Sequence, residues 1–170
     1  MSAQTLTPAD AAPPTQQPHD EPLLRAQAIA CGDVTIAVPF TWARAVVEDF
    51  DVSPAPNAPV WLVGAVNVDG RILPVLDLAA WLDEHAAQPV TRSSKLLVGG
   101  EGEDRYALLF QGLPMMVRYA PSGAATGSTT GALAPFVTGA ATPVADQAGR
   151  HWPVIDARTL GEHWAGELAV

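Results

Sequence analysis

The chain has 170 residues and a mass of 17.8 kDa, which suits one domain with a short additional tail. Its 18 acidic residues against 9 Lys and Arg give a net charge of −9, which argues against a general nucleic-acid binder or a protein that docks on an anionic membrane. The longest apolar run, residues 58–66, is far shorter than the ~20 residues of a spanning helix. No secretory signal is visible in residues 1–18, so direct membrane insertion is not expected.

Cysteine usage and composition indicate the compartment and the domain limits. The single cysteine, Cys31, excludes an intramolecular disulfide and a cysteine-built zinc site, so we expect a cytoplasmic protein with this thiol buried. Residues 1–24 are rich in Pro and Ala and predict a disordered tail, while residues 25–170 predict one folded domain. Within that domain, the Gly, Ser and Thr of residues 121–134 predict a flexible loop.

Short apolar runs separated by turn signals predict four β-hairpins. They pair residues 26–30 with 34–38, residues 60–68 with 71–76, residues 95–98 with 106–110, and residues 135–141 with 151–155. Helices are few: Asp77 is expected to cap a helix over residues 78–84, Asp156 to cap a C-terminal helix, and Thr41 to begin a short turn through Ala45. Many short strands at close spacing are typical of a barrel or a sandwich.

No catalytic constellation emerges from the reactive side chains. The acidic residues Glu48, Asp49 and Asp51 face no second cluster, and the glycines of residues 99–102 lead into a strand rather than a phosphate-binding helix. The four histidines lack metal-ligand spacing and the serines lack a nucleophile elbow. We therefore expect a binding module that needs no metal and no cofactor, with a small β-barrel enzyme or ligand-binding protein as a weaker alternative.

Residues 56–82 form the most singular segment of the chain. It resembles the central motif of the CheW-like family of chemotaxis coupling proteins, with matches at Pro56, Pro59, Gly64, Asn67, Gly70, Pro74, Val75, Asp77 and Leu78. The resemblance extends over residues 25–164, and it implies a mainly β fold of two small five-stranded β-barrels that share an apolar core, with a few short helices, one of them near the C-terminus.

The same resemblance implies a non-catalytic adaptor. Such proteins couple the regulatory domain of a chemotaxis-type histidine kinase to the cytoplasmic tips of methyl-accepting chemoreceptors, so we expect a cytoplasmic protein recruited to membrane-associated receptor arrays, with no nucleic-acid partner. This chain departs from the family pattern at three places: Asp69 stands where the family has Arg, Ala45 where it has Glu, and Gln111 where it has Asp. These departures raise two alternatives, the type IV pilus chemosensory branch and a scaffold without normal kinase coupling.

The partner-binding surface is expected on three apolar segments. Among the expected contact residues, the flexible side chains of Met115 and Met116 could either adapt to a partner or fill the core. The expected contact residues are Ala45, Val46 and Val47 after the first hairpin, Val68, Asp69, Gly70, Arg71 and Ile72 at the Asp-Gly turn, and Leu113, Met115 and Met116 after the middle hairpin.

Overall fold

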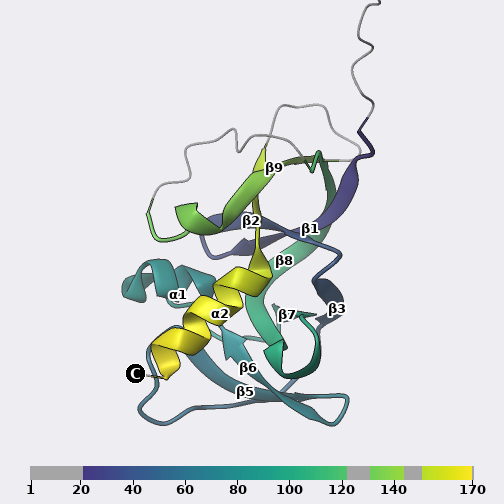
Figure 1. The fold of residues 1–170 in the computed structure, drawn as a ribbon. Coiled ribbons are helices and arrows are strands. Elements are labelled where there is room, and N and C mark those ends of the chain that lie inside the picture. The colour runs from purple at the N-terminus through teal and green to yellow at the C-terminus, as the bar shows by residue number, and fades with distance from the viewer. Residues whose placement is uncertain (1–20, 122–130, 144–150, 170) are drawn as a thin grey trace, which may run out of the picture.

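The structure is a computed structural model that describes residues 21–121, 131–143 and 151–169 (Figure 1). Most of the expected tail, residues 1–24, and of the expected loop, residues 121–134, lies outside these ranges, as does the turn of the last hairpin. The domain limits therefore remain a prediction. Within the described part, Leu24, the last residue of the expected tail, already belongs to strand β1. Leu133, which lies in the expected loop, is only 2 % exposed.

Ten strands and two α-helices, with three short 3₁₀ turns, make up the described part of the chain. The strands are β1 (Leu24–Cys31), β2 (Val34–Pro39), β3 (Ala43–Val47), β4 (Val52–Ser53), β5 (Leu62–Val68), β6 (Arg71–Leu76), β7 (Ser94–Gly99), β8 (Tyr106–Tyr119), β9 (Val137–Pro143) and β10 (Trp152–Ile155). The helices are α1 (Leu78–Leu82) and α2 (Ala157–Leu168), and the 3₁₀ turns are η1 (Glu84–Ala86), η2 (Gly102–Asp104) and η3 (Ala134–Phe136). The expectation of a mainly β fold with few helices, one near the C-terminus, is confirmed.

The strands form two groups that share the long strand β8 (Figure 1). One group is a closed ring in the order β1, β2, β10, β9, β8 and back to β1. The other group leaves the N-terminal half of β8 on both sides, through β7 to β3 and through β6 to β5 and β4. Among the described residues, no strand pairing joins β3 to β4, so the second group is not closed by backbone hydrogen bonds.

Three apolar clusters fill this architecture. One lies in the ring and includes Ala26, Val117 and Trp152, and a second lies in the other group and includes Leu73 and Leu109. The third and largest cluster joins both groups to α2, and it holds Ile36, Trp61, Leu108, Leu160 and Trp164 among others. The expected shared apolar core is therefore present, and α2 covers it.

The helix caps arise where the sequence predicts them. Asp77 accepts a hydrogen bond from the Ala80 N–H (3.2 Å), and Asp156 accepts one from the Thr159 N–H (3.1 Å). Helix α1 ends at Leu82, two residues earlier than expected, because Asp83 is extended and caps η1 instead. No helix in the described ranges is long and apolar enough to cross a membrane.

Two local expectations were wrong. The turn expected from Thr41 through Ala45 already ends at Trp42, and Ala43 begins strand β3, because Trp42 packs against the bare backbone of Gly99 and brings the following residues alongside β7. Strand β8 continues to Tyr119 rather than ending at residue 110, because residues 115–119 pair with β1 beyond a register shift. Gly112, with φ +83°, supplies the backbone conformation for that irregularity.

Candidate functional site

The tip of the β5–β6 hairpin is a tight two-residue turn. Asp69 and Gly70 have φ of +50° and +79°, and Val68 pairs directly with Arg71. The Asn67 Oδ1 accepts a hydrogen bond from the Gly70 N–H (3.0 Å). Positive φ at both central positions is typical of a type I′ turn, which favours Asn or Asp followed by Gly. Asp69, the residue that departs from the family pattern, therefore suits its backbone position.

Side chains change from surface to core between the second and third residues of β6. Ile72 is 69 % exposed, whereas Leu73 is 4 % exposed and packs in the second cluster. Val68 is half-buried against that cluster. The expected contact residues at this tip thus comprise an exposed set, Asp69 to Ile72, and one residue that mainly supports the core.

Strand β3 carries the next expected contact residues. Ala45 and Val46 are exposed, whereas Val47 is half-buried against the second cluster. Ion pairs from Arg44 to Glu101 and from Lys95 to Glu48 flank the strand. Because β3 pairs with β7 while Asp69 lies at the β5–β6 turn, two of the three family departures, Ala45 and Asp69, lie on different pairs of strands.

The last expected residues lie on β8 beyond Gly112. Leu113 is 87 % exposed, and Met115 and Met116 are each 45 % exposed. Of the two alternatives for the methionine pair, the structure therefore favours the surface. Pairing with β1 places Met116 opposite Gln27 and Met115 opposite Ala28, so the two thioethers point to opposite faces of the sheet.

Met116 lines an open apolar groove of about 540 Å³ (the β1–β8 groove). Its other lining residues are Leu24, Arg25, Phe40, Thr41 and Tyr119. Partial burial raises the pKa of Tyr119. Sequence reasoning missed Leu24, Phe40 and Tyr119, because only the pairing of β1 with β8 and the bond from the Phe40 N–H to the Arg25 carbonyl (3.2 Å) bring them together.

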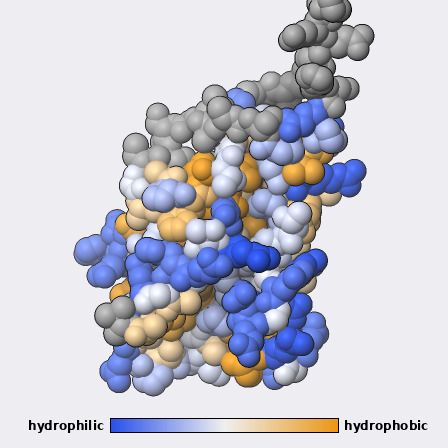
Figure 2. Space-filling model, viewed as in Figure 1, coloured by the Kyte–Doolittle hydropathy of each residue, from blue (hydrophilic) through white to orange (hydrophobic). Residues whose placement is uncertain are grey.

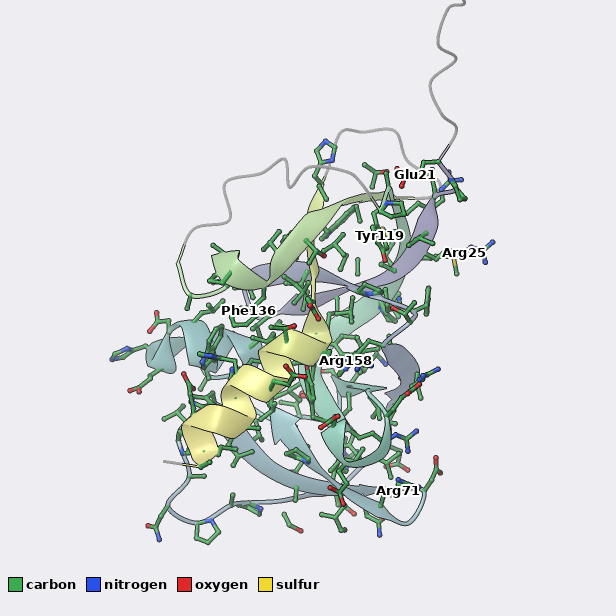
Figure 3. All side chains as sticks on the ribbon, viewed as in Figure 1. Glu21, Arg25, Arg71, Tyr119, Phe136 and Arg158 are labelled. Atoms are coloured by element: carbon green, nitrogen blue, oxygen red, sulfur yellow. The ribbon has the colours of Figure 1, made fainter. Side chains whose placement is uncertain are left out.

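The β1–β8 groove and the β5–β6 tip lie at opposite ends of the molecule. Figure 3 shows Arg25 and Tyr119 at one end and Arg71 at the other. Figure 2 shows apolar side chains over the start of β1 and again at the β5–β6 end, with hydrophilic side chains between them. The expected contact residues therefore belong to three separate groups, on β3, at the β5–β6 tip and on β8.

Two further hollows follow α2. One, of about 310 Å³, lies against Tyr106 and Trp164, and the other, of about 470 Å³, lies near Trp42 and Asp156. The Tyr106 hydroxyl donates to the Ala157 carbonyl (2.6 Å), and burial raises its pKa, so it ties β8 to α2 rather than acting as an acid or base. Asp104 and Arg158 line both hollows.

Several reactive groups of the described residues are buried or paired with a neighbour. Cys31 is fully buried, and this burial raises the pKa of its thiol. Glu48 pairs with Lys95 and Asp83 contacts His85. Within the described ranges, no three His, Cys, Asp or Glu side chains are placed to hold a metal ion. The described residues instead present exposed apolar side chains on the strands of the sheet.

Comparisons with known proteins agree with this architecture. The family model described as CheW-like domain matches residues 27–163. The chain is 32 % identical over 65 residues to a chemotaxis protein CheW of Rhizobium meliloti (strain 1021), a match that covers 38 % of this chain and 42 % of that protein. The chain thus spans under half the length of this curated relative.

A solved structure shares the fold. The crystal structure of the scaffolding protein TtCheW from Thermoanaerobacter tengcongensis superposes with a TM-score of 0.63 at 15 % sequence identity, covering 79 % of this chain and 89 % of that one. The family match extends across both strand groups and into α2. The protein therefore belongs to the CheW-like domain family.

Proposed function

We propose that this protein is a non-catalytic cytoplasmic adaptor that joins the regulatory domain of a chemotaxis-type histidine kinase to the cytoplasmic tip of methyl-accepting chemoreceptors. The observation that carries the proposal is the presence of exposed apolar side chains on two surfaces at opposite ends of one CheW-like fold. An adaptor must hold two partners at once, and two separated surfaces allow this without competition.

The shapes of the two surfaces suggest which partner each one takes. The β1–β8 groove is concave and apolar, which fits an amphipathic helix such as a receptor tip. The β5–β6 tip is a convex hairpin with Ile72 at its centre and Asp69 and Arg71 beside it, which fits a folded domain such as the kinase's regulatory domain. Apolar contact supplies affinity at both, and the charges at the tip supply selectivity.

A pair of titrations tests the proposal. The full chain is titrated at fixed salt against the regulatory domain of each chemotaxis-type kinase and against receptor cytoplasmic fragments from the same organism. We expect saturable binding with Kd of about 1–10 µM, or about −7 to −8 kcal/mol. The kinase that binds also identifies the pathway, including a type IV pilus system. Absence of binding to both classes would refute the adaptor function.

Single charges placed on each surface separate the two contacts. Ile72→Asp is expected to weaken binding of the kinase domain only, and Phe40→Asp binding of the receptor fragment only. Val90→Asp serves as the control and should change neither affinity: Val90 lies outside both surfaces and is 45 % exposed, between Phe40 at 38 % and Ile72 at 69 %. Equal loss in both titrations for either variant would refute the division of labour.

The scaffold that binds receptors without kinase coupling is the second candidate. It is favoured by the change at two charged positions of the family, Glu to Ala45 and Arg to Asp69. Asp69→Arg, which restores the family residue, is expected to change the affinity for the kinase domain by about 1–2 kcal/mol, the scale of an interface charge. Two results together would establish this second candidate. The wild type would bind the receptor fragment but no kinase domain, and only the Ala45→Glu/Asp69→Arg variant would bind a kinase domain.

A further inference from the structure

We propose that Met116 is an oxidation site that controls the β1–β8 groove: hydrogen peroxide converts its thioether to the sulfoxide, and the groove then loses affinity for an apolar partner. The inference rests on the function proposed above for that groove. The modification concerns one side chain that lines the groove. Met115, a nearby methionine outside the lining, serves as its comparison.

The sulfur atoms of the described residues differ widely in access to an oxidant. Met115 and Met116 are each 45 % exposed, whereas Cys31 has no exposed surface. Thiol oxidation requires an accessible thiolate, and the burial of Cys31 disfavours that form. A thioether needs no deprotonation, so exposure alone decides its reactivity. Peroxide is therefore directed to the two methionines of β8.

The strand geometry gives the two methionines different consequences. Met116 lines the groove together with Leu24 and Phe40, whereas Met115 points to the other face and is not part of the lining. Both are equally exposed, so both are expected to react. Only the product at position 116 alters the surface offered to a partner in the groove.

The chemistry is a two-electron oxygen transfer. One oxygen of hydrogen peroxide forms a bond with Sδ while the O–O bond breaks, so the sulfur is oxidised and the peroxide is reduced to water. The sulfoxide oxygen is a strong hydrogen-bond acceptor. Of the groove's other side chains, Leu24 and Phe40 offer it no donor, whereas Arg25, Thr41 and Tyr119 each carry one. Covering the sulfoxide with an apolar partner removes its water and weakens binding, and only a hydrogen bond from Arg25, Thr41 or Tyr119 offsets that cost. Sulfoxide reductases reverse the change.

The test compares the full chain with Met116→Leu and Met115→Leu, two matched variants that keep side-chain volume and remove one oxidation site each. Each protein is treated with hydrogen peroxide, mapped by mass spectrometry at both methionines and at Cys31, and titrated with the receptor fragment and the kinase domain. We expect oxidised wild type and Met115→Leu to bind the receptor fragment about tenfold more weakly. Peroxide should not change the affinity of Met116→Leu for the receptor fragment relative to the same variant before treatment. Kinase binding should not change in any of the proteins, and reductase treatment should restore the receptor affinity of the wild type.

Three results would overturn the inference. They are an equal loss in oxidised Met116→Leu, unchanged receptor affinity of a wild type mapped as sulfoxide at position 116, and a lowered melting temperature that explains the loss by unfolding. If the unoxidised chain binds no receptor fragment, the proposed function has failed instead. The dye 8-anilinonaphthalene-1-sulfonate, whose aromatic rings fluoresce on apolar surface, then probes the groove directly. Oxidation must lower its bound fluorescence in wild type and not in Met116→Leu, and the same fall in both proteins refutes the site.

Discussion

Neighbouring residues on β6 have opposite roles because a strand alternates its side chains. Leu73 is 4 % exposed within the second cluster, and Ile72, one residue earlier, is 69 % exposed. Both are large and aliphatic, so hydrophobicity does not distinguish them. The register of β6 against β5, in which Leu73 pairs with Val66, decides which one supports the fold and which one is offered to a partner.

This difference predicts the outcome of one substitution made at both positions. Leu73→Asp places an unpaired carboxylate in the core and is expected to lower the free energy of unfolding by more than about 3 kcal/mol, or to prevent folding. Ile72→Asp should melt within about 2 °C of the wild type, because its side chain stays in water. Thermal melting followed by circular dichroism checks both. A normal melt of Leu73→Asp would contradict the strand register.

The positive φ of Asp69 makes a second prediction at the residue scale. Asp69→Val should lower the free energy of unfolding by about 1–2 kcal/mol, since a β-branched residue is strained at φ +50°. Asp69→Asn should stay within about 0.5 kcal/mol of the wild type, because Asn tolerates this conformation. Urea unfolding measures both values. Equal stability of the Val and Asn variants would contradict the type I′ turn.

The packing of helix α2 depends on its close approach to Tyr106 of strand β8. Its Trp164 is 1 % exposed, with ring centroids 5.5 Å from Trp81 and 5.7 Å from Tyr106. Gly161 makes this approach possible, because a Cβ there would lie 2.5 Å from the Tyr106 Cε1. Gly166, on the same helix, has no such neighbour within 4 Å. One helix thus holds one glycine required by packing and one that is not.

The two glycines predict opposite effects of the same change. Gly161→Ala should lower the free energy of unfolding by about 1–3 kcal/mol, because the added methyl group forces α2 away from Tyr106. Gly166→Ala should raise it by up to about 1 kcal/mol, since Ala favours the helix and meets no neighbour. Urea unfolding of both variants tests the packing. Stabilisation by Gly161→Ala would show that α2 does not lie against Tyr106.

Burial couples the stability of the whole molecule to alkaline pH. The pKa of the Cys31 thiol is raised from its usual 9.0, and the pKa of the Tyr106 phenol is raised from its usual 10.0, both chiefly by desolvation. Above these usual values, the unfolded chain loses protons that the folded chain retains. The folded state therefore becomes less stable as pH rises, first through the thiol and then through the phenol.

Unfolding in urea between pH 8 and pH 11 tests this linkage. We expect stability to fall from about pH 9, with a slope approaching about 1.4 kcal/mol per pH unit for each buried group. Cys31→Ala should remove the contribution of the thiol throughout, which leaves little slope below about pH 10 and about half of the wild-type slope above it. A stability that is flat to pH 11 would mean that neither group is buried.

Local chemistry determined much of this protein from the sequence alone. The Asp-Gly turn, the Asp77 and Asp156 caps and the paired apolar runs of the hairpins depend on neighbouring residues only, so they could be located without the fold. The family motif in residues 56–82 coincides with the β5–β6 hairpin and the Asp77 cap of α1. The exposed residues at the β5–β6 tip were predicted for this reason.

Only the tertiary structure decided features that need two distant segments. Strand β8 passes residue 110 because β1 pairs with its second half, and β3 is a strand because β7 lies beside it. The same pairing places Leu24 and Tyr119 in the β1–β8 groove and turns Met116, rather than Met115, toward it. Strand register across such separations is set by the packing of the whole core, and no window of neighbouring residues contains that information.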